Sequence, residues 1–569
     1  MNTMKKIVKN ILLGMFVGCS LNVTTSCTDL TETLYSDLND TNIDLTNPDD
    51  IQLLEGQAIA QYRYLHTSWF GLFHQLEICT DQYMVPLRIG IGWGDVYING
   101  HKHNWDYNFG LSENNWGYAY NCINYCNMVL DNLPEDNVED RAQMRFFRAL
   151  TYYHLLDLFR NIPLQTTMNN PDGYVPEQVS GEEIYNFCVS ELNDIKDVIT
   201  TDYIHGWGNK YAVCMALAKL YLNKNVYLGT NDNQGYEDAL AEVETVLTEG
   251  GFELAPNYKD NFRENLEGNP EIIFCVPGDR THAVNFNLMT YVMPQAGMDA
   301  YASTATATNG SCAIPQFIDT YSANDKRLAD TWAMDLQHYA VENADGTYTP
   351  NAGDPIPFTA DDWSGTGYLN YNKNVHSIDG AYQQEGYRLH KYEIVGGGNW
   401  GTTSDDLVIF RLADAMFIKA ECLLRLGRDE QTAADLVTEV RKRSFESLAE
   451  ATRTVADLKG GSVYAYGHSE YEPIAYNDWS NYISTYEGGD DIELGGLFDD
   501  LGWEFACEEH RRQDMIRFKM ADGRNVFNGK SYFCKDAVTT DHWNIFPIPE
   551  SVMRTNTTIE QNPGYTGAK

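Results

Sequence analysis

Residues 145–164 read RFFRALTYYHLLDLFRNIPL, and this stretch decides the fold class. Phe146, Leu150 and Tyr153 recur at intervals of three to four residues, which places them on one apolar face of a helix. Pro163 ends the helix, because a proline pushes the residue before it out of the helical region. The stretch therefore predicts a core helix with a defined end, which is typical of an α-rich protein.

Three later segments carry equally specific residue orders: RLADAMFIKAECLLRLGR at 411–428, EFACEEHRRQDMIRF at 504–518 and FPIPESV…QNPGY within 546–565. Together with the first stretch, and in this order, they resemble the signature blocks of the SusD/RagB family, outer-membrane lipoproteins of Bacteroidetes that bind glycans. The resemblance implies a mainly α fold in which tetratricopeptide-like helical pairs pack against an irregular, loop-rich half with short strands. It also implies association with a SusC-like, TonB-dependent outer-membrane transporter.

The start of the chain has the composition of an export signal. Three lysines occur within the first nine residues, and a short apolar run follows at 11–17. This run is too short for a membrane-spanning helix, which needs about 20 apolar residues. We therefore predict a lipoprotein signal peptide over residues 1–26.

The predicted cleavage site lies before Cys27, because small residues directly before a cysteine are typical of lipoprotein processing. Acylation there anchors a chain without a transmembrane segment, since each buried methylene contributes roughly 0.8 kcal/mol. Residues 27–48, rich in Thr, Asp and Asn, then form the lipidated cysteine and a polar tether. Cys19 is a competing acylation site, and an ordinary secretory peptide with a free cysteine is the remaining alternative.

The composition limits the partners. The chain carries 81 acidic and 40 basic residues, a net charge of −41, which argues against a nucleic-acid partner because phosphates would be repelled. The charge favours solubility and a neutral ligand over an acidic one. Aromatic residues make up 12% of the chain, with 37 Tyr, and tyrosine suits both packing and sugar binding because its apolar ring ends in a polar group.

Twelve cysteines do not form a recognisable disulfide or zinc framework. Six of them lie within apolar helical patterns, where a thiol behaves as a small buried hydrophobic group. These six are Cys122, Cys126, Cys188, Cys214, Cys422 and Cys507.

Helical periodicity dominates two parts of the chain, about 49–250 and 404–444. Ser404 is the predicted N-cap of a helix whose buried stripe begins at Ile409 and whose C-cap is Gly427, and a second helix follows it. In the first part, helices are expected near 49–66, 113–132, 138–160, 180–199, 209–228 and 235–249.

The remaining segments have little helical periodicity. Glu271 to Val276 reads EIIFCV and predicts a short strand. Residues 277–403 and 445–500 are rich in Gly, Asn, Thr, Asp and aromatic residues, which predicts an irregular ligand-binding half. With the C-terminal blocks at 501–569, residues 49–569 are expected to form a single domain.

The charged residues of the block at 504–518 have helical spacing. Glu508 and Arg512 are four residues apart, and Asp514 and Arg517 are three apart, so each pair can meet on one helix face. We interpret these charges as structural rather than catalytic.

Residues 88–105 read RIGIGWGDVYINGHKHNW and are the first candidate for a ligand site. Sugar rings present apolar C–H faces and a rim of hydroxyls, so their sites combine flat aromatic rings with a few hydrogen-bonding side chains. The glycines allow an indole to stand out from a loop, and the resemblance places family ligand contacts in this region. The predicted glycan contacts here are Arg88, Trp93, Asp95, Asn99 and Trp105.

A second candidate patch lies in the irregular half, where the resembling family commonly adds aromatic rings opposite the first loop. We predict glycan contacts at Tyr291, Tyr301 and Trp332, with loop packing as the alternative for each. Trp116, in contrast, has helical spacing with Tyr120 and is predicted to lie in the core.

Motifs for catalysis are weak. Adjacent carboxylates do not define an acid/base pair, which needs two groups separated across a substrate. GHSEY at 467–471 lacks the final glycine of a nucleophile elbow, and His101 and His103 lack further metal ligands. We predict no enzymatic activity, no catalytic residue, no resident metal and no cofactor, while adventitious or structural calcium stays open. The acidic pairs are at 361–362, 490–491 and 499–500.

The sequence as a whole predicts a non-catalytic cell-surface lipoprotein that captures oligo- or polysaccharide and delivers it to the transporter. The predicted location is the outer membrane, with a lipid anchor and the protein facing the exterior. Capture of peptides or another nutrient by the same fold is the first alternative, and a surface glycoside hydrolase is the second. The loops carry no readable code for one particular glycan.

Overall fold

Helix α6 (Val138–Phe159) is the predicted core helix. Phe146 and Leu150 are fully buried and Tyr153 is nearly so, which confirms the apolar face read from the sequence. Arg160 has a φ of 63°, a backbone conformation that ends the helix, and Ile162–Pro163 forms the short strand β2. The helix end therefore lies where the proline predicts it.

The structure is a computed structural model. By contacts between residues, 51–569 form one compact unit. The predicted signal peptide, Cys19, Cys27 and nearly all of the predicted tether lie outside the described residues. The described residues are 47–278, 288–397, 405–471, 479 and 482–566.

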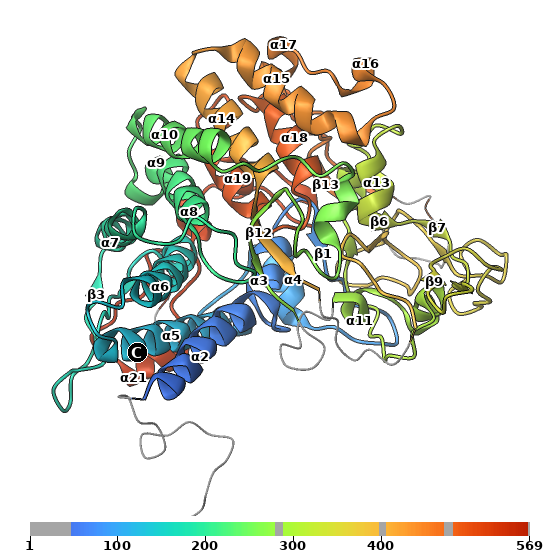
Figure 1. The fold of residues 1–569 in the computed structure, drawn as a ribbon. Coiled ribbons are helices and arrows are strands. Elements are labelled where there is room, and N and C mark those ends of the chain that lie inside the picture. The colour runs from blue at the N-terminus through green and yellow to red at the C-terminus, as the bar shows by residue number, and fades with distance from the viewer. Residues whose placement is uncertain (1–46, 279–287, 398–404, 472–478, 480–481, 567–569) are drawn as a thin grey trace, which may run out of the picture. The chain divides into compact units, whose positions relative to one another are not determined.

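Helices follow one another and pack pairwise through one half of the larger unit, as α5 on α6, α6 on α7, α8 on α10, and α14 on both α10 and α15. Figure 1 shows this series on the left and at the top, with short strands of the irregular half at the right. The predicted mainly α fold with an irregular half is confirmed. None of the described helices combines the length and apolar character that a membrane crossing requires. The bounds are α5 (Gly110–Asn132), α7 (Gly181–Ile195), α8 (Lys210–Leu222), α9 (Lys224–Leu228), α10 (Gln234–Glu249), α14 (Leu412–Leu426) and α15 (Glu430–Arg441).

A buried pair of strands joins the two helical segments of the chain. The predicted strand is β4 (Ile272–Val276), all five residues of which are buried, and it pairs antiparallel with β12 (Leu407–Arg411). Helix α14 starts only after β12, so the predicted helix start at Ser404 is wrong, and Ser404 itself lies outside the described residues. Periodicity alone cannot separate a short apolar strand from a buried helix, and here β4 supplies the partner edge. Gly427, with φ 64°, caps α14 as predicted.

The irregular half contains very short strands and helices connected by loops. Its strands are two residues long and form two-stranded pairs, which agrees with the low helical periodicity of the sequence. It includes α11 (Leu288–Val292), β5 (Cys312–Ala313), α12 (Pro315–Ile318), α13 (Lys326–Thr331), β6 (Trp332–Ala333), β7 (Asp335–Leu336), β8 (Val341–Glu342), β9 (Tyr348–Thr349), β10 (Asn370–Tyr371) and β11 (Arg388–Leu389).

The C-terminal part returns to the helices. It contains α16 (Leu448–Ala451), α17 (Val455–Lys459), β13 (Gly467–Tyr471), β14 (Tyr482–Ser484), α18 (Gly495–Glu504), α19 (Arg511–Arg517), α20 (Val526–Gly529), β15 (Tyr532–Phe533) and α21 (Glu550–Thr555). The prolines of the last block do exclude a long helix there, and α21 has only six residues.

A buried ionic network holds the centre of the larger unit together. Arg411, at the end of β12, donates to Glu271 at 3.0 Å, to Glu504 at 2.8 Å and to Glu508 at 2.9 Å. Arg443 contacts Glu271 and Glu504 as well. Charges removed from water need such saturated pairing, because an unpaired buried charge is very costly. The network therefore links β12 to the sequence block at 504–518.

The predicted pair of Glu508 with Arg512 is wrong. Cys507 and Glu509 have positive φ angles, so the segment before Arg511 turns instead of continuing one helix, and Glu508 faces Arg411. Arg512 pairs with Asp157 of α6 at 2.6 Å. The second predicted pair, Asp514 with Arg517, is confirmed at 2.6 Å.

All ten described cysteines are free and buried, including the six predicted to be so. Five of those six lie on helices, whereas Cys507 lies in the turn before α19. Trp116 is 8% exposed, which confirms its predicted place in the core.

Candidate functional site

The turn between α2 (Pro48–Thr67) and α3 (Leu72–Glu77) presents two aromatic side chains, Trp69 and Phe70, both partly exposed. Gly71 makes this turn possible. A Cβ at that position would lie 2.8 Å from the carbonyl oxygen of Leu65 and 2.9 Å from that of His66. Only a residue without a side chain fits so close to backbone, so the local sequence dictates where the two rings stand.

The loop before α4 (Asp95–His101) presents the predicted Trp93. The Arg88 and Gly92 backbones bond to each other in a tight turn, and Gly90 and Gly92 adopt φ angles of 78° and 126°. Trp93 itself has φ 73°, which is strained for a large side chain. Strain of this kind persists only where the surroundings over-determine the conformation.

The segment Thr308 to Gly310 supplies those surroundings. The Trp93 Nε1 donates to the Thr308 carbonyl at 3.0 Å. A Cβ at Gly310 would lie 2.5 Å from the indole of Trp93 and 2.6 Å from the carbonyl oxygen of Tyr291. The absence of a side chain at Gly310 therefore lets the indole lie directly on the backbone, beside Tyr291.

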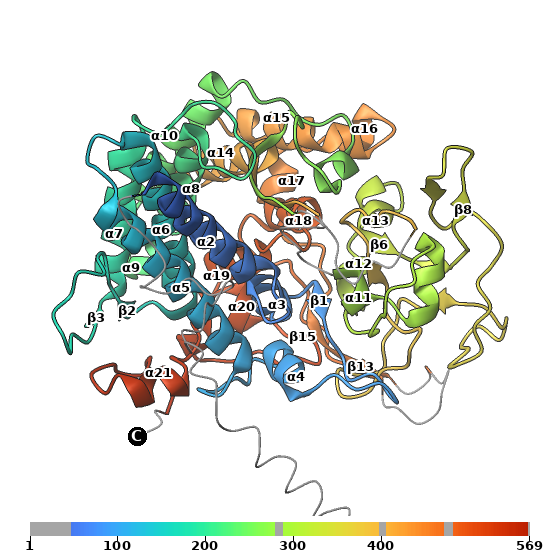
Figure 2. The ribbon, with the colours of Figure 1, turned by 60° about the horizontal axis from the view of Figure 1, so that its bottom comes forward.

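Trp69, Trp93 and Tyr291 form what we call the aromatic platform. The planes of the two indoles differ by 1°, with 5.0 Å between centroids, and the Tyr291 ring stands edge-on to Trp69 at 3.8 Å. All three rings are partly exposed. The platform draws on α3, α4 and α11, which Figure 2 shows near one another between the helices and the short strands.

Tyr291 of the platform and the neighbouring His74 are both uncharged. Burial lowers the pKa of His74 to about 4, so its imidazole, 5.6 Å from the Tyr291 ring, is neutral at physiological pH. Burial also raises the pKa of Tyr291 to about 12, so its hydroxyl keeps its proton. An apolar surface with neutral hydrogen-bonding groups is suited to a neutral polyhydroxylated ligand.

Two of the predicted polar contacts lie on α4, which begins two residues after Trp93. Asp95, two residues after Trp93, is exposed in the first turn of α4. Asn99 is one helical turn further on, is partly exposed, and accepts a hydrogen bond from Asn104 at 3.3 Å. Positions i and i+4 share one helix face, so both side chains can reach a ligand on the same side.

Two predicted contacts of the same loop are corrected. Arg88 is 1% exposed, and its guanidinium donates to the carbonyl oxygens of Gly310, Tyr382 and Glu385 at 2.8–2.9 Å. Trp105 is 3% exposed, and its Nε1 donates to the Tyr565 hydroxyl at 2.7 Å. Both side chains bond to distant segments of the chain. These segments cover the loop in the folded protein, so neither side chain is exposed.

The three residues of the second predicted patch lie in two separate places. Tyr291 joins the aromatic platform, whereas Tyr301 and Trp332 are 6% and 1% exposed and face a separate cavity of about 490 Å³. Polar and charged side chains, among them Lys259 and Arg263, also line that cavity. The three residues therefore do not form one surface.

Sequence reasoning missed Trp69 and Phe70. The motif that could have revealed them is Trp-Phe-Gly after a predicted helix, since the glycine marks a turn.

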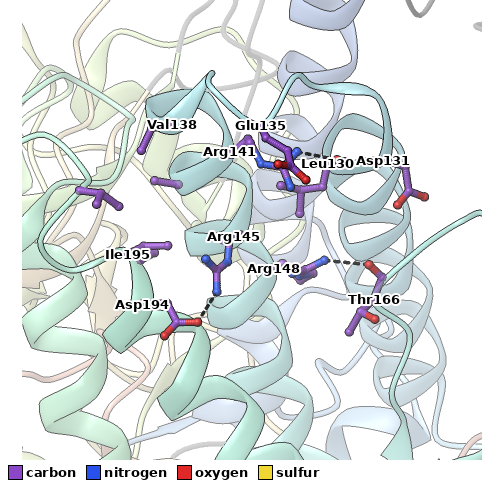
Figure 3. A pocket seen from close by; sticks show the side chains of 12 residues that line it. Leu130, Asp131, Glu135, Val138, Arg141, Arg145, Arg148, Thr166, Asp194 and Ile195 are labelled. Carbon is purple, nitrogen blue, oxygen red and sulfur yellow. Dashed lines mark hydrogen bonds and ion pairs between the residues drawn. The ribbon is translucent and has the colours of Figure 1, made fainter.

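Another pocket lies between α5, α6 and α7 and has a volume of about 420 Å³ (Figure 3). It is lined by three arginines, three carboxylates and several apolar side chains, and by no aromatic ring. Arg145 pairs with Asp194 at 2.8 Å, and Arg148 donates to the Thr166 carbonyl at 3.1 Å, as the dashed lines in Figure 3 show. A surface of paired charges without rings is less suited to sugars than the platform.

The residues with an apparent catalytic pattern have structural roles. Asp500 pairs with Arg441 and Arg453, and its neighbour Asp499 accepts from the Ser462 hydroxyl and the Val463 amide.

His101 and His103 are likewise buried. Burial lowers the pKa of His101 to about 3, and His103 shares a hydrogen bond with the Cys79 carbonyl at 2.8 Å.

Comparison with known families identifies the class. Residues 251–565 match the SusD family, and residues 87–222 match a family described as starch-binding and associating with the outer membrane. The first match spans more than half of the chain. The chain belongs to the SusD family.

Individual relatives are distant. The starch-binding protein SusD of Bacteroides thetaiotaomicron is 25% identical over 456 residues, which are 76% of this chain and 73% of that protein. The SusD-like protein P25 of Formosa agariphila is 22% identical over 417 residues, 71% of this chain and 69% of that protein.

Solved structures share the fold. Surface glycan-binding protein A from Bacteroides uniformis has a TM-score of 0.62 at 18% identity, covering 91% of this chain and 99% of that one. A laminarin binding SusD-like protein has a TM-score of 0.62 at 16% identity, covering 91% and 100%.

Proposed function

We propose that this protein is a non-catalytic cell-surface lipoprotein that captures oligo- or polysaccharide. The aromatic platform carries the proposal, because stacked, partly exposed indoles form a rigid aromatic group against which a sugar C–H face can pack. Rings held by surrounding backbone lose little conformational freedom on binding, which favours affinity. The starch-binding relative supports a glycan as the cargo.

Specificity would come from side chains at the edge of the platform. Asp95 and Asn99 on α4 and the protonated hydroxyl of Tyr291 can bond to sugar hydroxyls. The net charge of −41 disfavours anionic polysaccharides, so we expect a neutral glycan.

The proposal includes attachment to the outer membrane through acylated Cys27, with the protein facing the exterior. It also includes delivery of the glycan to a TonB-dependent transporter. The family description of outer-membrane association supports the location, and the cysteine after a short export signal supports the anchor. Handover to a transporter requires moderate affinity, which stacking plus a few exposed hydrogen bonds provides.

Affinity gel electrophoresis against a panel of neutral and acidic polysaccharides tests the proposal. Starch and laminarin belong in the panel because of the relatives that bind them. We expect one neutral polysaccharide to retard the protein, and Trp69→Ala and Trp93→Ala to abolish the retardation. Tyr486→Ala is the matched control, since Tyr486 is 80% exposed on another segment.

Two results would contradict the proposal. Retardation that survives both tryptophan substitutions would move the site to the cavity lined by Tyr301 and Trp332. Retardation by no polysaccharide would favour a peptide or another nutrient as the cargo.

A further inference from the structure

Three polar side chains from three segments meet beside the central strand pair. His205 lies in the connection between α7 and α8, Cys275 lies on β4, and Asp406 directly precedes β12. The Cys275 Sγ is 3.7 Å from the His205 Nδ1, and the His205 Nε2 is 3.2 Å from an Asp406 carboxylate oxygen. One ligand atom from each residue lies within 4.8 Å of the other two.

The carboxylate of this group is held in place by backbone. Asp406 accepts from the Gly278 amide at 2.9 Å through one oxygen and from the Leu266 amide at 2.8 Å through the other. Its side chain is 2% exposed. In metal sites, hydrogen bonds of this kind form the second coordination shell. They hold a carboxylate ligand in the orientation in which it binds the ion.

A phenol completes the surroundings. The Tyr203 hydroxyl is 3.2 Å from the His205 Nδ1 and 3.5 Å from the Cys275 Sγ. The His205 side chain is 26% exposed, whereas Cys275 is fully buried. The histidine side is therefore open to an ion arriving from solvent, and the thiol closes the inner side.

The chemistry of the three donors selects one class of ion. Thiolate, imidazole and carboxylate together suit Zn²⁺, which binds sulfur at about 2.3 Å and nitrogen or oxygen at about 2.0–2.2 Å. Tetrahedral geometry with these bond lengths separates ligand atoms by roughly 3.3–3.8 Å. The 3.7 Å separation involves the His205 Nδ1 and the 3.2 Å separation involves the His205 Nε2, and an imidazole offers only one nitrogen to a given ion. The His205 ring must therefore turn, so that one nitrogen, the thiol and the carboxylate, which lie within 4.8 Å of one another, close around the ion.

We propose that Cys275, His205 and Asp406 form a Zn²⁺ site, distinct from the aromatic platform and built from other segments. Water or the Tyr203 hydroxyl takes the fourth position, and binding displaces the thiol proton of Cys275. The ion ties the α7–α8 connection to the β4–β12 strand pair, so its role is structural.

Titration of the untagged, chelator-treated protein with Co²⁺, a spectroscopic substitute for Zn²⁺, tests the site. We expect one equivalent to produce a thiolate-to-cobalt charge-transfer band, which Zn²⁺ then displaces. Cys275→Ser should lose the band. His205→Gln, at a partly exposed position, should weaken binding by roughly tenfold or more.

Cys188→Ala is the matched control, because Cys188 is a buried thiol on α7 whose contact is the Ala149 carbonyl. We expect this variant to bind Co²⁺ as the unmodified protein does. The melting temperature provides a second readout. It should be higher in Zn²⁺ than in EDTA for the unmodified protein, and the same in both for His205→Gln. Absence of the band, or a band unchanged in both Cys275→Ser and His205→Gln, would overturn the proposal and leave a metal-free hydrogen-bonded cluster.

Discussion

The indole rings of Trp69 and Trp93 lie parallel, with 1° between their planes and 5.0 Å between their centroids. They come from two separate turns, and each turn depends on a nearby glycine with no room for a side chain or with a positive φ. At this separation the parallel rings stack against each other with an offset, which holds the pair rigid. The candidate site is therefore a product of backbone geometry as much as of the aromatic residues themselves.

Substitution of the two tryptophans should show that they act together. We expect Trp69→Ala and Trp93→Ala each to weaken glycan binding by roughly tenfold or more, as central aromatic contacts do. The double variant should lose less than the sum of the two free-energy changes, because each ring supports the other. Isothermal titration calorimetry with the polysaccharide that retards the protein in the gel measures these free-energy changes. Strictly additive losses would mean that the rings bind independently.

Gly310→Ala should disturb the platform without touching a ligand. Its Cβ would lie 2.5 Å from the Trp93 indole and 2.6 Å from backbone, so the ring must move. We expect glycan affinity to fall and stability to decrease by about 1–3 kcal/mol, the usual cost of overpacking.

Gly117→Ala is the matched control for this substitution. Gly117 lies exposed within α5 with open space around it, and alanine there should stabilise the protein by roughly 0.5–1 kcal/mol. Binding assays and thermal unfolding of both variants separate the two effects. Unchanged affinity in Gly310→Ala would show that the position of Trp93 does not matter.

Arg411→Met should strongly destabilise the fold. It leaves Glu271, Glu504 and Glu508 with fewer partners in a dry environment, and breaking such a pair typically costs 3–5 kcal/mol, so we expect a loss of about that size. Arg524→Met removes an exposed pair with Asp522 and should cost less than about 1 kcal/mol. Urea unfolding compares them, and similar midpoints would argue against a central role of the network.

Glu77→Gln should gain stability relative to the unmodified protein as the pH rises. Burial raises the pKa of Glu77 from 4.5 to about 8, so the folded state favours the neutral acid. A raised carboxyl pKa contributes stability below the unfolded value of 4.5 and loses it as the pH rises through the folded value near 8. Glutamine stays neutral and avoids this loss.

Unfolding midpoints measured between pH 5 and pH 9 test that expectation. The difference between Glu77→Gln and the unmodified protein should grow with pH up to about 8 and then level off. A difference that does not depend on pH would mean that Glu77 is already ionised in the folded protein.

Long periodic helices could be predicted closely. The predicted 138–160 became α6 (Val138–Phe159), because its apolar stripe and its terminating proline are both local. The region after 404 could not be predicted in the same way, since β12 becomes a strand only through pairing with β4, more than a hundred residues earlier. Pairing with a distant strand leaves no pattern in the local sequence.

The candidate site was predicted in part. Trp93 and Tyr291 were identified as exposed aromatic candidates, and the structure brings them together around Trp69, which sequence reasoning missed. Arg88 and Trp105 looked equally suitable in the sequence but are buried, with hydrogen bonds from Arg88 to Gly310, Tyr382 and Glu385 and from Trp105 to Tyr565. Burial depends on which distant segments return to a loop, and a loop sequence does not contain that information.

The sequence by itself determined the helices, the family and the chemical character of the binding loop. Apolar periodicity, glycines and prolines act over a few residues, so their consequences can be read directly along the chain. Only the tertiary structure decided which aromatic rings remain at the surface, that Glu508 pairs with Arg411, and that His205, Cys275 and Asp406 meet. These are contacts between residues far apart in the chain, and they exist only once packing of the core has fixed the path of the backbone.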